Sequence, residues 1–135
     1  MINFDKTPNP ATVEVVRNAF ISGAEQMRRN LYRSSFSPVI YEMKDCSVGI
    51  FDAEGSLLGQ APGLPFFLGS LGGTIRNIIS SKSSKIFQSD DIWIVNDSAI
   101  CGSHLNDITV FAPIFVEKNL RGFAGAKAHC NDVGA

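Results

Sequence analysis

The stretch ITVFAPIFV (residues 108–116), followed by EKN (117–119) and LRGFAGAKA (120–128), decides the fold of this 135-residue chain. Two apolar, β-favouring runs separated by a short polar segment are typical of a β-hairpin. Pro113 has no backbone N–H, so we expect it at a sheet edge or at a β-bulge. A hairpin folded at 117–119 also brings residue 108 back beside residue 128.

The longest helix signal lies at residues 10–33. Asn9 stands where a helix cap is wanted, and Pro10 occupies the first helical position, where a missing N–H costs nothing. The apolar residues of this segment recur on one helical face, and they are Val13, Val16, Phe20, Met27 and Leu31. The spacing predicts an amphipathic helix.

The middle of the chain predicts smaller elements. Residues 46–51 and 56–60 predict a second hairpin, in which Gly55 supplies the positive φ of the turn. A shorter helix is expected from Ser70, its cap, through Ile79, with a polar loop at 80–84, and residues 92–95 predict a short buried strand. Together the segments predict one α+β unit, with an N-terminal helix followed by antiparallel strand hairpins and one further short helix.

Composition excludes several classes of partner. Twelve Lys and Arg residues balance 13 Asp and Glu residues, for a net charge of -1, so we expect no nucleic-acid partner. The apolar runs are much shorter than the roughly 20 residues of a spanning helix, so no membrane partner is expected either. The first six residues lack the pattern of a secretory signal, and three cysteines without a C-x-x-C pair argue against a disulfide framework. We therefore expect a cytoplasmic chain with reduced thiols.

Both histidines of the chain begin the same pattern, His-x-Asn-Asp, at residues 104–107 and 129–132. Imidazole and carboxylate groups commonly bind divalent metals, and two His with one carboxylate leave positions open for water or substrate. Because the hairpin brings its two ends together, His104, Asp107 and His129 are candidate ligands of a catalytic metal. The alternative is that each pattern is a local turn, in which Asn and Asp bond nearby backbone.

The cysteines and glycines give weaker evidence for a binding site. A zinc site that also used Cys101 and Cys130 is disfavoured, because the adjacent His129 and Cys130 point to opposite sides of an extended chain. The cysteines are expected to fill space as small, semi-apolar groups. The glycines at 69, 72 and 73 match neither a P-loop nor a dinucleotide fingerprint, so no nucleotide site is expected within the chain.

Several stretches, in order along nearly the whole chain, resemble the hydantoinase B family, which includes the corresponding parts of 5-oxoprolinase and of the acetone carboxylase alpha subunit. They are VEVVRNA (13–19), SP (37–38) with Glu42, DCS (45–47), FD (51–52), LGS (68–70), ND (96–97), GSHLNDIT (102–109), AH (128–129) and DVG (132–134). The resemblance implies an ATP-dependent hydrolase of small cyclic amides, of the 5-oxoprolinase or hydantoinase type, or a carboxylase. It also implies a hydantoinase A-type partner subunit or domain that handles ATP and phosphoryl transfer.

The resemblance further implies a divalent metal ion, manganese or zinc. In metal-containing relatives the ion is held by the motifs G-[ST]-H-x-x-D and A-H-x-x-D-V-G, which map the ligands onto His104, Asp107 and His129. Asp132, in the second motif, is a candidate for an outer partner that orients a ligand.

The chain departs from the family pattern around this site. Phe67 and Cys130 stand where family members have His, residues 98–99 replace a Pro-aromatic pair, and Cys101 replaces Gly. A phenyl ring at position 67 can neither donate nor accept a proton. Family subunits continue far beyond the D-V-G motif, so we expect residues 1–135 to be an incomplete N-terminal piece of a larger fold, whose strand at 120–128 lacks a neighbour on one edge. The alternative function is a catalytically inactive structural or assembly module, or a relic of such an enzyme.

Overall fold

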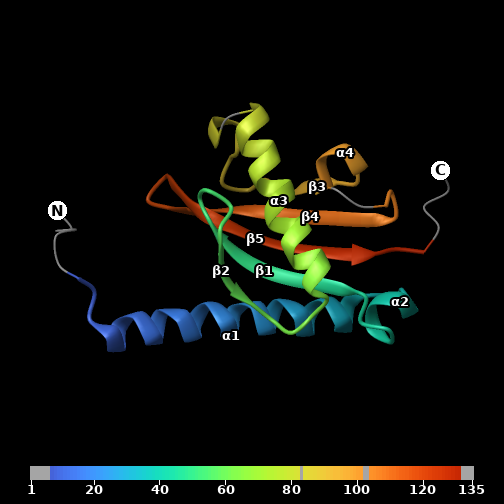
Figure 1. Cartoon of the computed structure of the whole chain (residues 1–135), viewed down its shortest axis with the longest axis horizontal. Coiled ribbons are helices and arrows are strands. Elements are labelled where there is room, and N and C mark those ends of the chain that lie inside the picture. The colour runs from blue at the N-terminus through green and yellow to red at the C-terminus, as the bar shows by residue number, and fades with distance from the viewer. Residues whose placement is uncertain (1–6, 83, 102–103, 132–135) are drawn as a thin grey trace.

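The computed structural model describes residues 7–82, 84–101 and 104–131. The elements, in chain order, are α1 (Pro10–Ser34), α2 (Pro38–Tyr41), β1 (Cys46–Asp52), β2 (Leu57–Gln60), α3 (Pro65–Lys82), the 3-10 helix η1 (Ser84–Ile86), β3 (Trp93–Val95), α4 (Ser98–Cys101), β4 (Asp107–Val116) and β5 (Asn119–His129). Helices lie on both faces of one antiparallel sheet (Figure 1). The predicted α+β class is confirmed.

The five strands are ordered β2-β1-β5-β4-β3. β4 and β5 form the hairpin predicted at 108–128, with Ile108 opposite Ala128. β5 is the central strand, because β1 pairs with its other edge over the whole length from Cys46 to Asp52. The expectation that the strand at 120–128 has an open edge is therefore wrong: an earlier segment of the same chain pairs with that edge.

α1 lies along the face of the sheet formed by β1 and β2 (Figure 1). Its predicted cap is confirmed, since Asn9 Oδ1 accepts a hydrogen bond of 2.9 Å from the Ala11 N–H. Ala24, at the middle of the helix, packs against Val48 of β1. The apolar stripe is only partly used, because the first turns of α1, with Val13 and Val16, are exposed.

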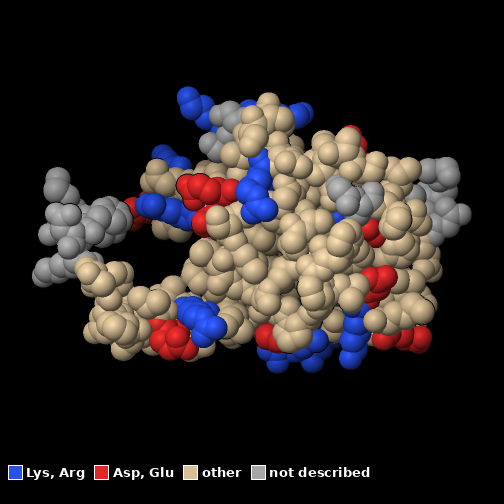
Figure 2. Space-filling model, viewed as in Figure 1, with Lys and Arg blue, Asp and Glu red and all other residues tan. Residues whose placement is uncertain are grey.

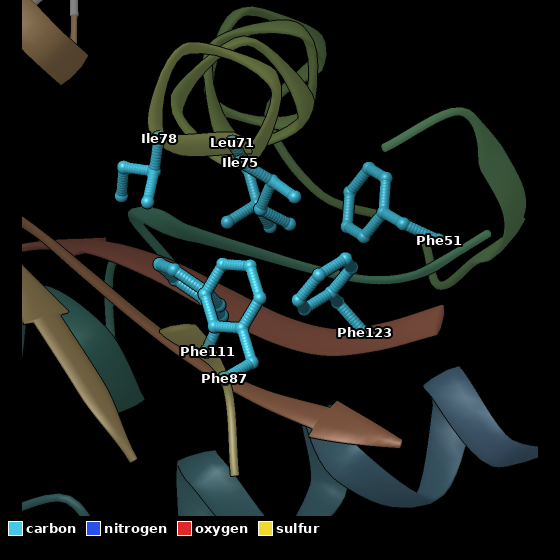
Figure 3. Packing of buried hydrophobic residues seen from close by; sticks show 7 residues of the cluster. All are labelled: Phe51, Leu71, Ile75, Ile78, Phe87, Phe111 and Phe123. Atoms are coloured by element: carbon cyan, nitrogen blue, oxygen red, sulfur yellow. The ribbon is translucent and has the colours of Figure 1, made fainter. Parts of the chain in front are cut away.

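The main core lies between α3 and the opposite face of the sheet. In Figure 3 the helix directs aliphatic side chains toward phenyl rings of the strands, and Phe87 lies among the rings. The ring centroids of Phe87 and Phe123 are 4.9 Å apart at an interplanar angle of 73°, an edge-to-face arrangement that aromatic pairs prefer. The buried members of this core are Phe51, Leu71, Ile75, Ile78, Phe87, Phe111 and Phe123.

α3 is longer than predicted at both ends. It begins at Pro65 and not at Ser70, and it continues to Lys82 through part of the segment expected to be a loop. Pro65 fits the first position of a helix because no N–H is needed there. Ser70 is consequently not a cap: its Oγ donates to the Phe67 carbonyl, one turn back in the helix.

β3 is an edge strand, which contradicts the prediction of a buried strand at 92–95. Trp93 faces the core and stacks on Phe111, with ring centroids 6.1 Å apart. Ile92 and Ile94 are 72% and 69% exposed, because alternation along the strand places them on the side opposite Trp93, which packs on the core.

The predicted turn and the placement of Pro113 are both confirmed. Gly55 has a φ of 83°, and Asp52 Oδ1 accepts hydrogen bonds from the backbone N–H groups of Glu54 and Ser56. Pro113 lies beyond the part of β4 that pairs with β3, and a register shift follows directly after Ile114. Among the described residues, β4 therefore has a neighbouring strand on one side only at Pro113.

The surface agrees with the balanced composition. Figure 2 shows acidic and basic side chains in small, interspersed groups on the face in view. The described part of the chain contains no helix that is both long and apolar enough to cross a membrane. Cys46, Cys101 and Cys130 are unpaired thiols.

Candidate functional site

The hairpin of β4 and β5 carries a carboxylate and an imidazole at its open end. Asp107 begins β4 and lies opposite His129, the last residue of β5. Two features set this pairing. In the tight turn at the other end, Glu117 and Lys118 both have a left-handed φ, 49° and 67°, and a register shift between Ile114 and Phe115 then moves the pairing by one residue, so that Asp107 faces His129 and not Ala128. A turn with positive φ at both central residues matches the twist of an antiparallel hairpin.

Asp107 and His129 form a close pair. Asp107 Oδ1 and His129 Nδ1 are 2.7 Å apart, and the Asp107 side chain is 1% exposed while that of His129 is 34% exposed. Asp107 Oδ2 is buried without a hydrogen-bond partner in the described part of the chain. A buried oxygen of this kind usually binds an ion, a water molecule or a hydrogen-bond donor, because a buried acceptor without a partner costs free energy of folding.

His104 lies apart from this pair. It is exposed in the connection between α4 and β4, and its carbonyl accepts the Asp107 N–H at 3.0 Å, so residues 104–107 form a turn. Within the described residues, no group of three or more His, Cys, Asp or Glu side chains is close enough to hold a metal ion. The structure therefore brings together two of the three predicted ligands. Asp132, the predicted outer partner, lies outside the described residues.

Among the residues that the structure describes, Asn106 does not bond nearby backbone, as the turn alternative expected, but the backbone of a residue 24 positions along the chain. Its carbonyl accepts the Cys130 N–H at 2.8 Å, and its side-chain amide donates to the Cys130 carbonyl at 3.4 Å. These contacts join the turn at 104–107 to the residue that follows His129. Asn106 thus has a structural role, while the close pair is formed by the Asp of the first pattern, Asp107, and the His of the second, His129.

Lys127 is a member of this site that sequence reasoning missed. Its side chain is fully buried, and its Nζ donates to Ser70 Oγ at 3.0 Å and to the Cys101 carbonyl at 3.1 Å. Burial lowers the pKa of the Lys127 ammonium, and Cys101 and Asp107 oppose that shift. The strand alternation Phe123, Gly125, Lys127, His129 puts Lys127 on the core-facing side of β5, and this signal was present in the sequence.

Thr109 and Lys127 form a second facing pair of polar residues, next to Asp107 and His129; each facing pair is called a rung. Thr109 lies opposite Lys127, just as Asp107 lies opposite His129. Thr109 Oγ1 is also buried without a hydrogen-bond partner in the described part of the chain. At its open end, the core-facing side of the hairpin therefore carries four polar side chains. The rest of that side is apolar.

The departures from the family pattern surround these rungs. Phe67 is 6% exposed, and its ring centroid lies 5.7 Å from Lys127 Nζ. Cys101 supplies the carbonyl that Lys127 binds. Cys130 follows His129, and burial raises the pKa of its thiol. Phe67 and Cys101 are thus structural neighbours of Lys127, while Ser98 and Ala99 lie in α4.

These features define an α+β protein with a polar site where two paired strands of its sheet meet. The chain belongs to the hydantoinase B/oxoprolinase family, whose model matches residues 9–135.

The relatives are much longer proteins. An uncharacterized protein of Methanocaldococcus jannaschii is 39% identical over 125 residues, which are 91% of this chain and 22% of the relative. 5-Oxoprolinase 1 of Arabidopsis thaliana is 34% identical over 90% of this chain and 10% of its own length. Caprolactamase subunit beta of Pseudomonas jessenii is 30% identical over 95% of this chain and 22% of its own length. The chain thus spans between about a tenth and about a fifth of the length of these relatives.

Two solved structures share the fold. The ATP-dependent caprolactamase of Pseudomonas jessenii superposes with a TM-score of 0.81 and 28% identity, over 96% of this chain and 22% of that chain. A nucleotide-free acetone carboxylase superposes with a TM-score of 0.82 and 24% identity, over 94% of this chain and 17% of that chain. In both proteins the fold described here is one part of a larger enzyme chain.

Proposed function

We propose that this chain forms the metal-binding, N-terminal part of a hydantoinase B-type hydrolase of cyclic amides. A divalent ion, manganese or zinc, would be held by His104, Asp107 and His129. The observation that carries the proposal is the buried, unpartnered Oδ2 of Asp107 beside the His129 imidazole.

The donor set fits such an ion. Two imidazole nitrogens and one carboxylate oxygen suit manganese or zinc and leave coordination positions open. Asp107 and His129 are already adjacent, and His104 is an exposed side chain on the turn that leads into Asp107. A bound ion would supply Lewis acidity, which polarises a carbonyl or activates water. The residues of the chain would bind the ion and, through the buried Asp107 carboxylate, hold the His129 ring in one orientation.

The nature of the substrate and of the partner rests on the relatives. 5-Oxoprolinase and caprolactamase are names of enzymes that open cyclic amides, and one relative is named as a subunit. We propose a hydantoinase A-type partner for ATP and phosphoryl transfer, because the sequence of this chain carries neither a P-loop nor a dinucleotide fingerprint. The unpaired cysteines favour a cytoplasmic location.

A second candidate is a catalytically inactive assembly module. The observation in its favour is Phe67, whose phenyl ring is packed beside Lys127 where the family pattern has an imidazole. In this case the chain would still fold and associate with a hydantoinase A-type protein, but it would not support turnover.

Metal titration tests the site. Isothermal titration with Mn²⁺ and with Zn²⁺ would compare the wild type with His104→Ala, Asp107→Asn and His129→Ala, and we expect each variant to lose at least about tenfold in affinity. Asp90→Asn, which removes an exposed carboxylate outside the proposed ligand set, is the matched control. No binding by the wild type, or an equal loss in Asp90→Asn, would contradict the proposed site.

An activity assay separates the two candidates. The chain alone is not expected to release glutamate from 5-oxoproline with ATP, and robust release by the lone chain would show that the ATP chemistry has been misplaced. With a purified hydantoinase A-type protein, ATP-dependent hydrolysis supports the enzyme. Binding of the two proteins without hydrolysis supports the assembly module.

A further inference from the structure

A buried ammonium lies directly behind the Asp107–His129 pair. Lys127 precedes His129 by two residues on β5, so both side chains are on the core-facing side of the sheet, and Lys127 lies beside Asp107 on the neighbouring rung. Its Nζ reaches α3 through Ser70 Oγ and reaches the C-terminal end of α4 through the Cys101 carbonyl. One side chain thus connects the sheet to the two helices that flank the site.

We infer that Lys127 is a positioning residue, which holds the segment bearing His104 against the Asp107–His129 pair. The inference rests on the proposed function only in so far as it concerns metal binding. α4 ends at Cys101, three residues before His104, and the Lys127 ammonium fixes the last carbonyl of that helix. From the other end, the Asp107 N–H holds the His104 carbonyl. Lys127 therefore ties the end of α4, and Asp107 ties His104, to the β4–β5 hairpin.

In the described part of the chain, three side-chain hydrogen bonds hold the end of α4, and the one from Lys127 is the strongest. Cys101 Sγ donates to the Val95 carbonyl over a long 3.6 Å. Asn77 donates to the Ile100 carbonyl at 3.0 Å, but Asn77 is exposed. The Lys127 contact is buried, and its donor is charged. Charge-assisted hydrogen bonds are roughly twice as strong as neutral ones, and a low-dielectric setting strengthens them further.

The direction in which metal affinity changes distinguishes a positioning role of Lys127 from a simple electrostatic effect of its charge. A lysine ammonium close to a cation site repels the cation, so removal of the charge alone would raise metal affinity. Removal of the tether would lower metal affinity, because His104 would be held less well. Lys127→Met has a side chain of similar length without charge or donor, and it therefore sets the two effects against each other.

The first measurement is made on the metal-free chain. Amide hydrogen exchange of Asp107 reports the turn closed by the His104 carbonyl, and we expect it to be about tenfold faster in K127M than in the wild type, because a buried charged hydrogen bond is lost. Ser70→Ala removes the hydrogen bond from Lys127 Nζ to α3 and is the matched control, since it leaves the contact with α4 in place. Ile78→Ala, a core truncation in α3, controls for general loss of stability. Both controls are expected to leave Asp107 exchange within about twofold of the wild type under native conditions.

The second measurement is a double-mutant cycle by Mn²⁺ titration. K127M should lower affinity by about tenfold in the wild-type background, the size typical for loss of an outer partner of a ligand. In the His104→Ala background it should not lower affinity, because the ligand it positions is gone. If K127M does not fold, Lys127→Gln, whose side chain is one bond shorter and carries no charge, replaces it with the same expected direction.

Unchanged or higher Mn²⁺ affinity in K127M, or an equal loss with and without His104, would overturn the inference. Equal loss of Asp107 protection in Ser70→Ala or Ile78→Ala would also overturn it. If the wild type binds no Mn²⁺, the proposed metal site fails by itself. Exchange at Asp107 then decides whether Lys127 holds the turn.

Discussion

Replacement of Gly122 by Ala should destabilise the protein by pushing apart its two longest-range paired strands. Gly122 lies on β5 opposite Asp52 of β1. A Cβ atom added there would overlap the Phe51 carbonyl oxygen and would lie 3.2 Å from the carbonyl carbon. The obstacle is backbone in a sheet ladder, so it cannot move aside as a flexible side chain would.

The magnitude follows from two costs. Overpacking of an ordered interior costs about 1–3 kcal/mol, and a weakened ladder hydrogen bond adds about 0.5–1.5 kcal/mol. We therefore expect the free energy of unfolding to fall by about 2–4 kcal/mol, a large part of the roughly 5–15 kcal/mol that is usual for a domain. At about 3–5 °C per kcal/mol for a chain of this size, Tm should fall by about 6–20 °C.

Urea denaturation followed by circular dichroism measures this change. Gly73→Ala is the matched control, because a Cβ at Gly73 meets no atom within 4 Å. Ala also favours a helix over Gly by up to about 1 kcal/mol, so this variant should be stabilised. If Gly122→Ala is within about 0.5 kcal/mol of the wild type, the β1–β5 spacing described here is wrong.

Two more changes test the edge strand and a buried thiol. Ile94→Lys, on the exposed face of β3, should change the free energy of unfolding by no more than about 0.5 kcal/mol while lowering self-association in light scattering, and a large loss of stability would mean that β3 is buried after all. Burial raises the pKa of the Cys46 thiol, so the folded chain binds that proton more tightly than the unfolded chain, and its stabilisation is full below the ordinary thiol pKa of about 8.5 and is lost as the pH rises further. Urea titrations between about pH 7.5 and about pH 9.5 should therefore show a steeper loss of stability for the wild type than for Cys46→Ala, and parallel slopes would refute the assignment.

The strong local signals were sufficient for several elements. Asn9 and Pro10 marked the start of α1, Gly55 marked the turn between β1 and β2, and both were confirmed because capping and positive φ depend on a few neighbouring residues. The β4–β5 hairpin was predictable for the same reason, and with it the meeting of Asp107 and His129.

Errors appeared where the answer depended on distant partners. Whether residues 92–95 are buried depends on where the strand lies in the sheet, and β3 lies at an edge. Periodicity along four residues cannot distinguish an edge from a centre. The extent of α3 was underestimated because its first turn, with Phe66 and Phe67, reads locally as part of a Pro- and Gly-rich loop.

The sequence by itself determined the α+β class, the family and the hairpin that joins Asp107 to His129, since these depend on local patterns and on motifs in order along the chain. Only the tertiary structure decided that β1 pairs with β5, that Gly122 must have no side chain and that Lys127 is buried behind the site. The physical reason is that burial and close approach are set by segments that are distant in sequence. Lys127 makes the point clearly: alternation along β5 places it on the core-facing side, but its Nζ donates to Ser70 and Cys101, which lie in two helices distant from it in sequence.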